Sequence, residues 1–245
     1  MKALARMISR ALAMVLVVAT CLPAAAAQAR YSDLLALCYH DVVDTYEQTL
    51  LDDMAVTVDT LVRHFSWLAA NGYEPISLAQ WQAAAQGGAL PDKPVLLSFD
   101  DGYSSFRSRV LPLLELYGFP AVLAPVTSWV DTPRSTPVKY GDELRGREDF
   151  LFWDELREIQ ASGLVEIVSH SNDLHRGVPA NPYGNLLPAA AAHRFDAARG
   201  YETDAQYRTR IADDLQRSVV LLESELGMPP AAMVWPYGAY NAVAA

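Results

Sequence analysis

Short apolar runs alternate along this chain with stretches whose apolar residues recur at helical spacing. The most continuous run, Pro94–Phe99, predicts a strand that is buried on both faces. Similar runs predict further strands at 33–39, 73–76, 120–126, 164–169 and 231–235. Leu61, Phe65 and Leu68 fall at i, i+4 and i+7, which indicates an amphipathic helix that begins near Asp59.

Glycines mark the boundaries between the predicted helices and strands. Helices are expected over 59–71, 77–86, 105–117, 153–161 and 203–226, and strands repeatedly follow a glycine: Gly72, Gly118, Gly163 and Gly227. This alternation of helices and strands is typical of successive βα units and predicts an α/β fold with a parallel sheet inside a layer of helices. No linker rich in Gly, Ser or Pro divides the chain, so we expect one barrel-like domain, and we expect it to continue beyond residue 245.

The N-terminal residues have the pattern of an export signal. Basic residues precede an apolar run over 11–19, and a small-residue stretch follows it. This predicts a cleaved signal peptide over residues 1–29, a mature domain over 30–245 and a periplasmic location. The alternative is a lipoprotein signal that ends at Cys21 and anchors the protein to the outer membrane. Thr20 matches that alternative poorly, so we favour cleavage.

The composition is acidic. The formal net charge is −10, and removal of residues 1–29 takes away three positive and no negative charges, which lowers it to −13. Such a chain is a poor candidate for binding nucleic acid or anionic membranes, and it suits a neutral substrate or a cationic product. Cys38 then remains as the one cysteine, so no internal disulfide forms, and its apolar surroundings predict a buried, inert thiol.

Polar residues gather where the predicted strands end. The first strand is followed by His40, the strand at 94–99 by Asp100 and Asp101, and the strand at 164–169 by His170. Sites in parallel α/β sheets form at the carboxyl ends of the strands, so we expect these side chains to meet. Three of the five histidines, at 40, 170 and 175, lie at or near such ends.

The residue types at these ends favour a metal site. His170 and His175 are five positions apart, so they converge only where the chain turns between them. Together with the carboxylate of Asp101 they would bind one divalent ion, and zinc, cobalt, nickel and iron all accept these ligands. Asp100 then suits a general base and His40 a general acid for hydrolysis. The alternatives are a loop with solvated aspartates and a structural pair of histidines.

Three motifs at these positions resemble the polysaccharide deacetylase superfamily (NodB-like, carbohydrate esterase family 4). They are SFDDGY at 98–103, HSNDLH at 170–175 and WPYGAYN at 235–241. The resemblance implies a deformed (β/α)-barrel in which Asp100 is the base and Asp101 and the two motif histidines bind the metal. It also implies an acetyl pocket lined by the third motif. We expect the substrate-binding residues to be Tyr103, whose neighbouring backbone N–H groups stabilise the oxyanion, and Trp235, Pro236, Tyr237 and Gly238. Trp235 and Tyr237 would stack on a sugar ring or, equally, belong to the core.

Further stretches resemble a subgroup, the periplasmic poly-β-1,6-N-acetyl-D-glucosamine N-deacetylases of biofilm export systems. They are ALCYHDV at 36–42, YETDAQYRTRIADDL at 201–215 and the third motif. In that subgroup the acid histidine comes from the first strand, which implies a circularly permuted barrel, and His40 matches it. Its members also have a C-terminal glycoside-hydrolase-like domain and are often lipoproteins. Val234 stands where the wider family has an arginine that orients the base.

The resemblance therefore implies metal-dependent removal of N-acetyl groups from an exported polysaccharide during production of the biofilm matrix. The implied partners are that polysaccharide and an outer-membrane export machinery. One alternative is a non-catalytic polysaccharide-binding or export module, which Val234 favours. Another is a deacetylase of chitin oligomers, peptidoglycan or xylan.

Overall fold

A parallel sheet forms the centre of the computed structural model, which describes residues 34–52, 54–141 and 143–244. The predicted signal peptide and Cys21 lie outside these residues. The strands of the sheet run in the order β1 (Leu35–Tyr39), β5 (Pro94–Asp101), β6 (Ala121–Pro125) and β9 (Val165–Ile167), and β4 (Glu74–Pro75) pairs with the start of β5. All of these pairs are parallel. The predicted α/β architecture is therefore confirmed.

The remaining elements connect or cover these strands. The helices are α1 (Tyr46–Thr49), α2 (Val58–Ala70), α3 (Leu78–Ala85), α4 (Leu111–Tyr117), α5 (Thr127–Val130), α6 (Trp153–Ala161) and α7 (Asp204–Leu226). A π-helical turn at Phe106–Val110 precedes α4, and short 3₁₀ turns lie at Arg147–Asp149 and Pro236–Gly238. Small two-stranded pairs are formed by β2 (Val42–Val43) with β3 (Val56–Thr57), β7 (Val138–Tyr140) with β8 (Glu143–Arg145), β10 (Gly177–Pro179) with β11 (Leu186–Pro188), and β12 (Phe195–Asp196) with β13 (Gly200–Tyr201).

The local signals explain where the helices begin and how they face. The apolar stripe predicted for α2 is buried at Leu61, Phe65 and Leu68. The side chains of Ser77 and Thr203 accept hydrogen bonds from backbone N–H groups in the first turns of α3 and α7, as N-cap residues do. These helices form where the sequence predicts them, because the capping residue and the spacing of apolar residues are both determined by residues that are close together in the chain.

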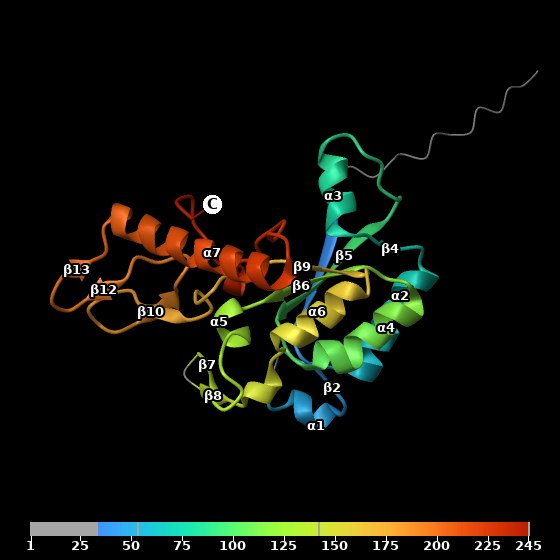
Figure 1. The fold of residues 1–245 in the computed structure, drawn as a ribbon, viewed down its shortest axis with the longest axis horizontal. Coiled ribbons are helices and arrows are strands. Elements are labelled where there is room, and N and C mark those ends of the chain that lie inside the picture. The colour runs from blue at the N-terminus through green and yellow to red at the C-terminus, as the bar shows by residue number, and fades with distance from the viewer. Residues whose placement is uncertain (1–33, 53, 142, 245) are drawn as a thin grey trace, which may run out of the picture.

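The two faces of the sheet have different neighbours. Apolar side chains of β5 and β6 pack on one face against α2, α4 and α6, which lie together on one side of the sheet (Figure 1). The opposite face is covered in part by α3 through Leu78, which packs with Val122, Ala124 and Val168. Because side chains alternate along a strand, Asp100 lies on this second face while Phe99 belongs to the first.

Two stretches differ from the sequence-based expectation. Residues 127–149, for which the sequence predicts neither a helix nor a strand, contain α5 and the β7–β8 hairpin. The buried Arg147 holds this region together, because its guanidinium donates to the carbonyl oxygens of Thr132, Phe150, Val130 and Leu151 over 2.7–3.0 Å. The strand expected at 231–235 is reduced to a parallel bridge between Ser169 and Met233.

The described sheet is open. Its ladder runs from β1 to the bridge at Met233, and within the described residues these two ends are not paired with each other. The deformed, permuted and C-terminally truncated barrel therefore stays a prediction. Across the described ranges, no helix has both the length and the apolar character that crossing a membrane requires.

Candidate active site

The end of β5 presents two adjacent carboxylates in different directions. Asp100 is still in extended backbone, whereas Asp101 and Gly102 have φ values of 71° and 80°. A Cβ at position 102 would lie 2.8 Å from Cβ of Pro125, so only glycine fits this turn beside β6. The reversal separates the two side chains, and each enters its own group of residues.

Asp101 meets the two histidines of the HSNDLH segment. Its Oδ1 lies 3.1 Å from Nε2 of His175 and 3.4 Å from Nε2 of His170, and all three side chains are buried. The chain can bring both rings to one point because Ser171 adopts φ 71° and reverses the backbone between them. The structure thus brings together the three residues that the sequence suggests as metal ligands.

The hydrogen bonds around this triad fit a cation. Nδ1 of His170 lies 2.9 Å from the carbonyl oxygen of Val234, which makes Nδ1 the protonated nitrogen and leaves the lone pair of Nε2 facing Asp101. Oδ1 of Asp101 is buried without a hydrogen bond among the described residues. Burial raises the pKa of Asp101, but hydrogen bonds and charge from the two histidines, when their Nε2 atoms carry protons and no ion is bound, more than offset this and hold the pKa well below its usual range. Converging acceptor atoms of this kind are suited to a divalent ion.

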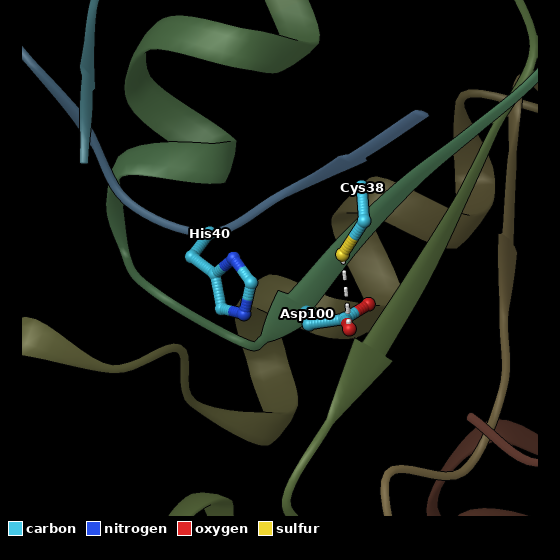
Figure 2. A group of neighbouring side chains, drawn as sticks. All are labelled: Cys38, His40 and Asp100. Carbon is cyan, nitrogen blue, oxygen red and sulfur yellow. Dashed lines mark hydrogen bonds between the residues drawn. The ribbon is translucent and has the colours of Figure 1, made fainter. Parts of the chain in front are cut away.

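Asp100 lies in a separate group with residues of β1. Its Oδ1 accepts a hydrogen bond of 2.9 Å from the Ser98 hydroxyl, and its Oδ2 accepts one of 3.2 Å from the Cys38 thiol. His40, which directly follows β1, completes the group, and the potential ligand atoms of Cys38, His40 and Asp100 lie within 4.8 Å of one another (Figure 2). The proposed base and acid are therefore neighbours.

The expectation that Cys38 is buried is wrong. The residue is exposed, and β1 is an edge strand of the sheet that the described residues form. Its sulfur is nevertheless packed beside Asp100. Partial burial of the thiol, and then the charge of Asp100, raise its pKa far above the ordinary value.

A profile of the polysaccharide deacetylase family matches residues 87–245, which include all three motifs. The chain belongs to the polysaccharide deacetylase family. It is 44% identical over 217 residues to the poly-β-1,6-N-acetyl-D-glucosamine N-deacetylase of Escherichia coli K12, a match that covers 87% of this chain and 32% of that protein. The chain thus spans about a third of the length of the curated relatives it matches most strongly.

Solved structures of deacetylases have the same fold. A de-N-acetylase from Aggregatibacter actinomycetemcomitans superposes with a TM-score of 0.82 at 41% identity, covering 86% of this chain and 82% of that one. The BpsB deacetylase domain from Bordetella bronchiseptica gives a TM-score of 0.76 at 39% identity over the same shares. The architecture of this chain is therefore that of a polysaccharide deacetylase domain.

The substrate-binding residues suggested by the sequence occupy different positions around the deacetylase site. Tyr237 has φ 60° and is 54% exposed, and its ring centroid lies 4.4 Å from that of His175. Pro236 is buried and Gly238 exposed beside it. Trp235 is half-buried, stacks on Tyr240 with 6.0 Å between ring centroids, and packs on the apolar cluster beneath α7. Among the described residues, no hydrogen bond or ring contact joins Trp235 to Asp101, His170 or His175.

The ring of Tyr103 belongs to an apolar cluster and not to an open surface. The ring is 3% exposed and stacks on Phe150. Residues 103 and 150 form an antiparallel bridge in which Gly102 accepts from Leu151 and Ser104 donates to Asp149. The Tyr103 N–H therefore points away from this partner, and it has no acceptor among the described residues.

Sequence reasoning missed the aromatic enclosure of the triad. The hydroxyl of Tyr140 on β7 donates to Oδ2 of Asp101 over 3.2 Å. Tyr140 and Trp129 also contact the ring of His175, with centroid distances of 5.5 Å and 5.0 Å. Both residues come from the stretch at 127–149, where the sequence has no periodicity that would have indicated them.

Asp214 on α7 is a second residue that the motifs do not include. Its two carboxylate oxygens accept the backbone N–H groups of Asn172 and Asp173, each over 2.8 Å. Burial raises the pKa of Asp214, although these hydrogen bonds oppose the shift. The carboxylate fixes the turn between the two histidines to the long helix.

Proposed function

We propose that this chain removes N-acetyl groups from N-acetylglucosamine units of poly-β-1,6-N-acetylglucosamine, releasing acetate. The observation that carries the proposal is the convergence of Asp101, His170 and His175 directly beside Asp100 at the end of β5. The linkage and the sugar are supported by the names of the Escherichia coli relatives at 44% identity. The chain spans about a third of the length of the Escherichia coli relatives, so the substrate of this chain is part of the proposal.

Asp101, His170 and His175 would hold one divalent ion, and zinc, cobalt, nickel and iron are the candidates. When bound, such an ion lowers the pKa of water and polarises a carbonyl oxygen. Tyr140 and the carbonyl oxygen of Val234 orient two of the ligands, so the donor atoms are positioned before the ion arrives.

The other residues account for the proton transfers of amide hydrolysis. Asp100 accepts the proton of the attacking water, with its carboxylate oriented by the hydroxyl of Ser98. The Tyr103 N–H stabilises the negative charge that develops on the amide oxygen. His40 donates a proton to the departing amine. The product sugar is a cation at neutral pH, which suits the acidic chain.

Val234 stands where the wider family has an arginine that orients the base, so in this chain other groups must orient Asp100. Its side chain packs in the apolar cluster with Leu78, Val122 and Ala124, and it brings no positive charge to Asp100. The hydrogen bonds that Asp100 receives come from neutral groups instead. This arrangement supports a base that works without the arginine partner of the wider family.

The remaining parts of the proposal concern the whole protein. We propose a permuted barrel, export to the periplasm through residues 1–29, and cooperation with an outer-membrane export machinery. Attachment to the outer membrane through a lipid on Cys21 is the alternative. The sequence signals described above support these points.

Acetate release from β-1,6- and β-1,4-linked N-acetylglucosamine oligomers tests the function. After chelation, the protein is reloaded with zinc, cobalt, nickel or iron in turn. We expect β-1,6 oligomers to react fastest, and Asp100→Asn to lose about 10²–10⁴-fold in rate while it still binds metal. Asp92→Asn, at an exposed site, is the matched control. Equal rates for Asp100→Asn and the wild type would refute the mechanism, and oligomer binding without acetate release would indicate a binding module.

A further inference from the structure

Cys38, His40 and Asp100 form a second set of metal-ligand side chains, separate from the Asp101–His170–His175 triad. Cys38 lies near the end of β1 and His40 directly follows that strand, and their potential ligand atoms lie near each other. Asp100 joins them from β5, which pairs with β1 in parallel register. Figure 2 shows the side chains of positions 38 and 40 beside the Asp100 carboxylate, with the sulfur directed at it.

The distances within this group suit a small divalent cation. The possible ligand atoms all lie within 4.8 Å of one another, and Sγ of Cys38 is 3.2 Å from Oδ2 of Asp100. Metal–sulfur bonds of about 2.3 Å and metal–nitrogen or metal–oxygen bonds of about 2.1 Å place tetrahedral ligands roughly 3.6 Å apart. Rotamer shifts of about 1 Å would therefore close the group around an ion.

The charges and the exposure of the group also fit a cation. A thiolate and a carboxylate together supply the two negative charges that balance a divalent ion, and the imidazole is a neutral third ligand. Cys38 is exposed, so an ion can reach it from solvent. The Asp101 triad contains no sulfur, whereas a thiolate selects soft and borderline ions such as cadmium and zinc. The two sets therefore differ in the ions that they prefer.

We propose that Cys38, His40 and Asp100 bind a thiophilic divalent cation, with zinc as the natural candidate, and that this second ion inhibits the enzyme. On binding, the Cys38 thiol loses its proton to water, and a sulfur–metal bond replaces its hydrogen bond to Asp100. Inhibition rests on the proposed function, because the ion occupies the carboxylate and the imidazole that serve there as base and acid. Binding of the ion does not depend on that function.

Cadmium binding tests the site. The full chain is used in a Cys21→Ser background, in which Cys38 is the remaining thiol. After chelation and dialysis against cadmium, we expect about two ions per chain and an ultraviolet thiolate-to-cadmium charge-transfer band. Cys38→Ser should bind one ion fewer and lose the band, whereas Asp101→Asn should lose the other ion and keep the band. Absence of the band in the parent protein, or a Cys38→Ser variant that binds as many ions, overturns the site.

Acetate release tests the inhibition. For each protein, the rate of acetate release is measured with the Asp101–His170–His175 site saturated with its metal ion. The rate is then measured again after addition of zinc at about ten times the dissociation constant of the second site. About one part in eleven of the parent protein is then free of the second ion, so its rate should fall about tenfold. Cys38→Ser and Cys38→Ala should show no such fall. A second bound ion without a change in rate overturns the inhibition. If no acetate is released at all, the proposed function fails, and the cadmium band and stoichiometry still decide whether the site exists.

Discussion

The hydroxyl of Tyr140 donates a hydrogen bond to Oδ2 of Asp101, while Oδ1 of the same carboxylate faces His170 and His175. One oxygen is thus oriented by the β7–β8 hairpin and the other is left for a cation. The stretch at 127–149 is for this reason part of the site and not a surface excursion.

We predict that Tyr140→Phe weakens metal binding about 10–100-fold, because the carboxylate loses the group that orients it. Competition with a chromophoric chelator at fixed pH measures the affinity. Tyr183→Phe is the matched control, since Tyr183 is 90% exposed and should leave the affinity unchanged. Equal affinities for Tyr140→Phe and the wild type would show that the hydrogen bond does not orient the ligand.

Replacing the proposed acid should slow amide hydrolysis more than ester hydrolysis. We expect His40→Gln to lower the rate of N-deacetylation about 10²–10⁴-fold at unchanged metal content, because the amine needs a proton to depart. An acetyl ester of an acidic phenol needs none, so its hydrolysis should lose much less. His64→Gln, at an exposed position, serves as the control. Equal losses on both substrates would assign His40 another role.

The turn that carries the two histidines should depend on Asp214. We expect Asp214→Asn to lower the free energy of unfolding of the metal-free protein by about 1–3 kcal/mol, because the amide can no longer accept from both N–H groups. The metal affinity should fall as well, since the turn loosens. Asp213→Asn, an exposed neighbour on the same helix, is the control. Lost stability with an unchanged metal affinity would contradict the positioning role.

The ion pair between Glu202 and Arg210 should give a pH-dependent contribution to stability. The carboxylate of Glu202 accepts from the guanidinium over 2.9 and 2.8 Å and from the Arg194 N–H over 3.0 Å. Burial raises the pKa of Glu202, but these hydrogen bonds and the charge of Arg210 more than offset it, so the pKa lies below its ordinary value. A pKa that is lower in the folded than in the unfolded protein stabilises the fold above the unfolded pKa, and the effect is lost as the pH falls through the folded pKa.

We therefore predict that Glu202→Gln is less stable than the wild type by about 1–3 kcal/mol at neutral pH. The difference should shrink as the pH falls below about 4, the ordinary range of glutamate. Urea unfolding across this range measures it, with the exposed Glu223→Gln as control. A difference that stays constant down to pH 3 would mean that ionisation of Glu202 does not stabilise the fold.

The sequence predicted those features that neighbouring residues determine. The stripe of α2, the helices predicted to begin at positions 77 and 203, and the buried strand β5 depend on spacing and local hydrogen bonds, and the structure has all of them. The strand-end rule also indicated which polar residues would meet. Asp101 and His170 lie together because parallel strands bring their carboxyl ends to one edge of the sheet.

Only the tertiary structure decided which other side chains surround these residues. Tyr140 is 39 positions from Asp101, and Asp214 is 42 positions from Asn172, so no local sequence pattern predicts either hydrogen bond. The exposure of Cys38 was decided in the same way, because an apolar run does not reveal that its strand lies at an edge of the described sheet. Periodicity reports which side of an element avoids water, whereas packing between distant segments determines what that side meets.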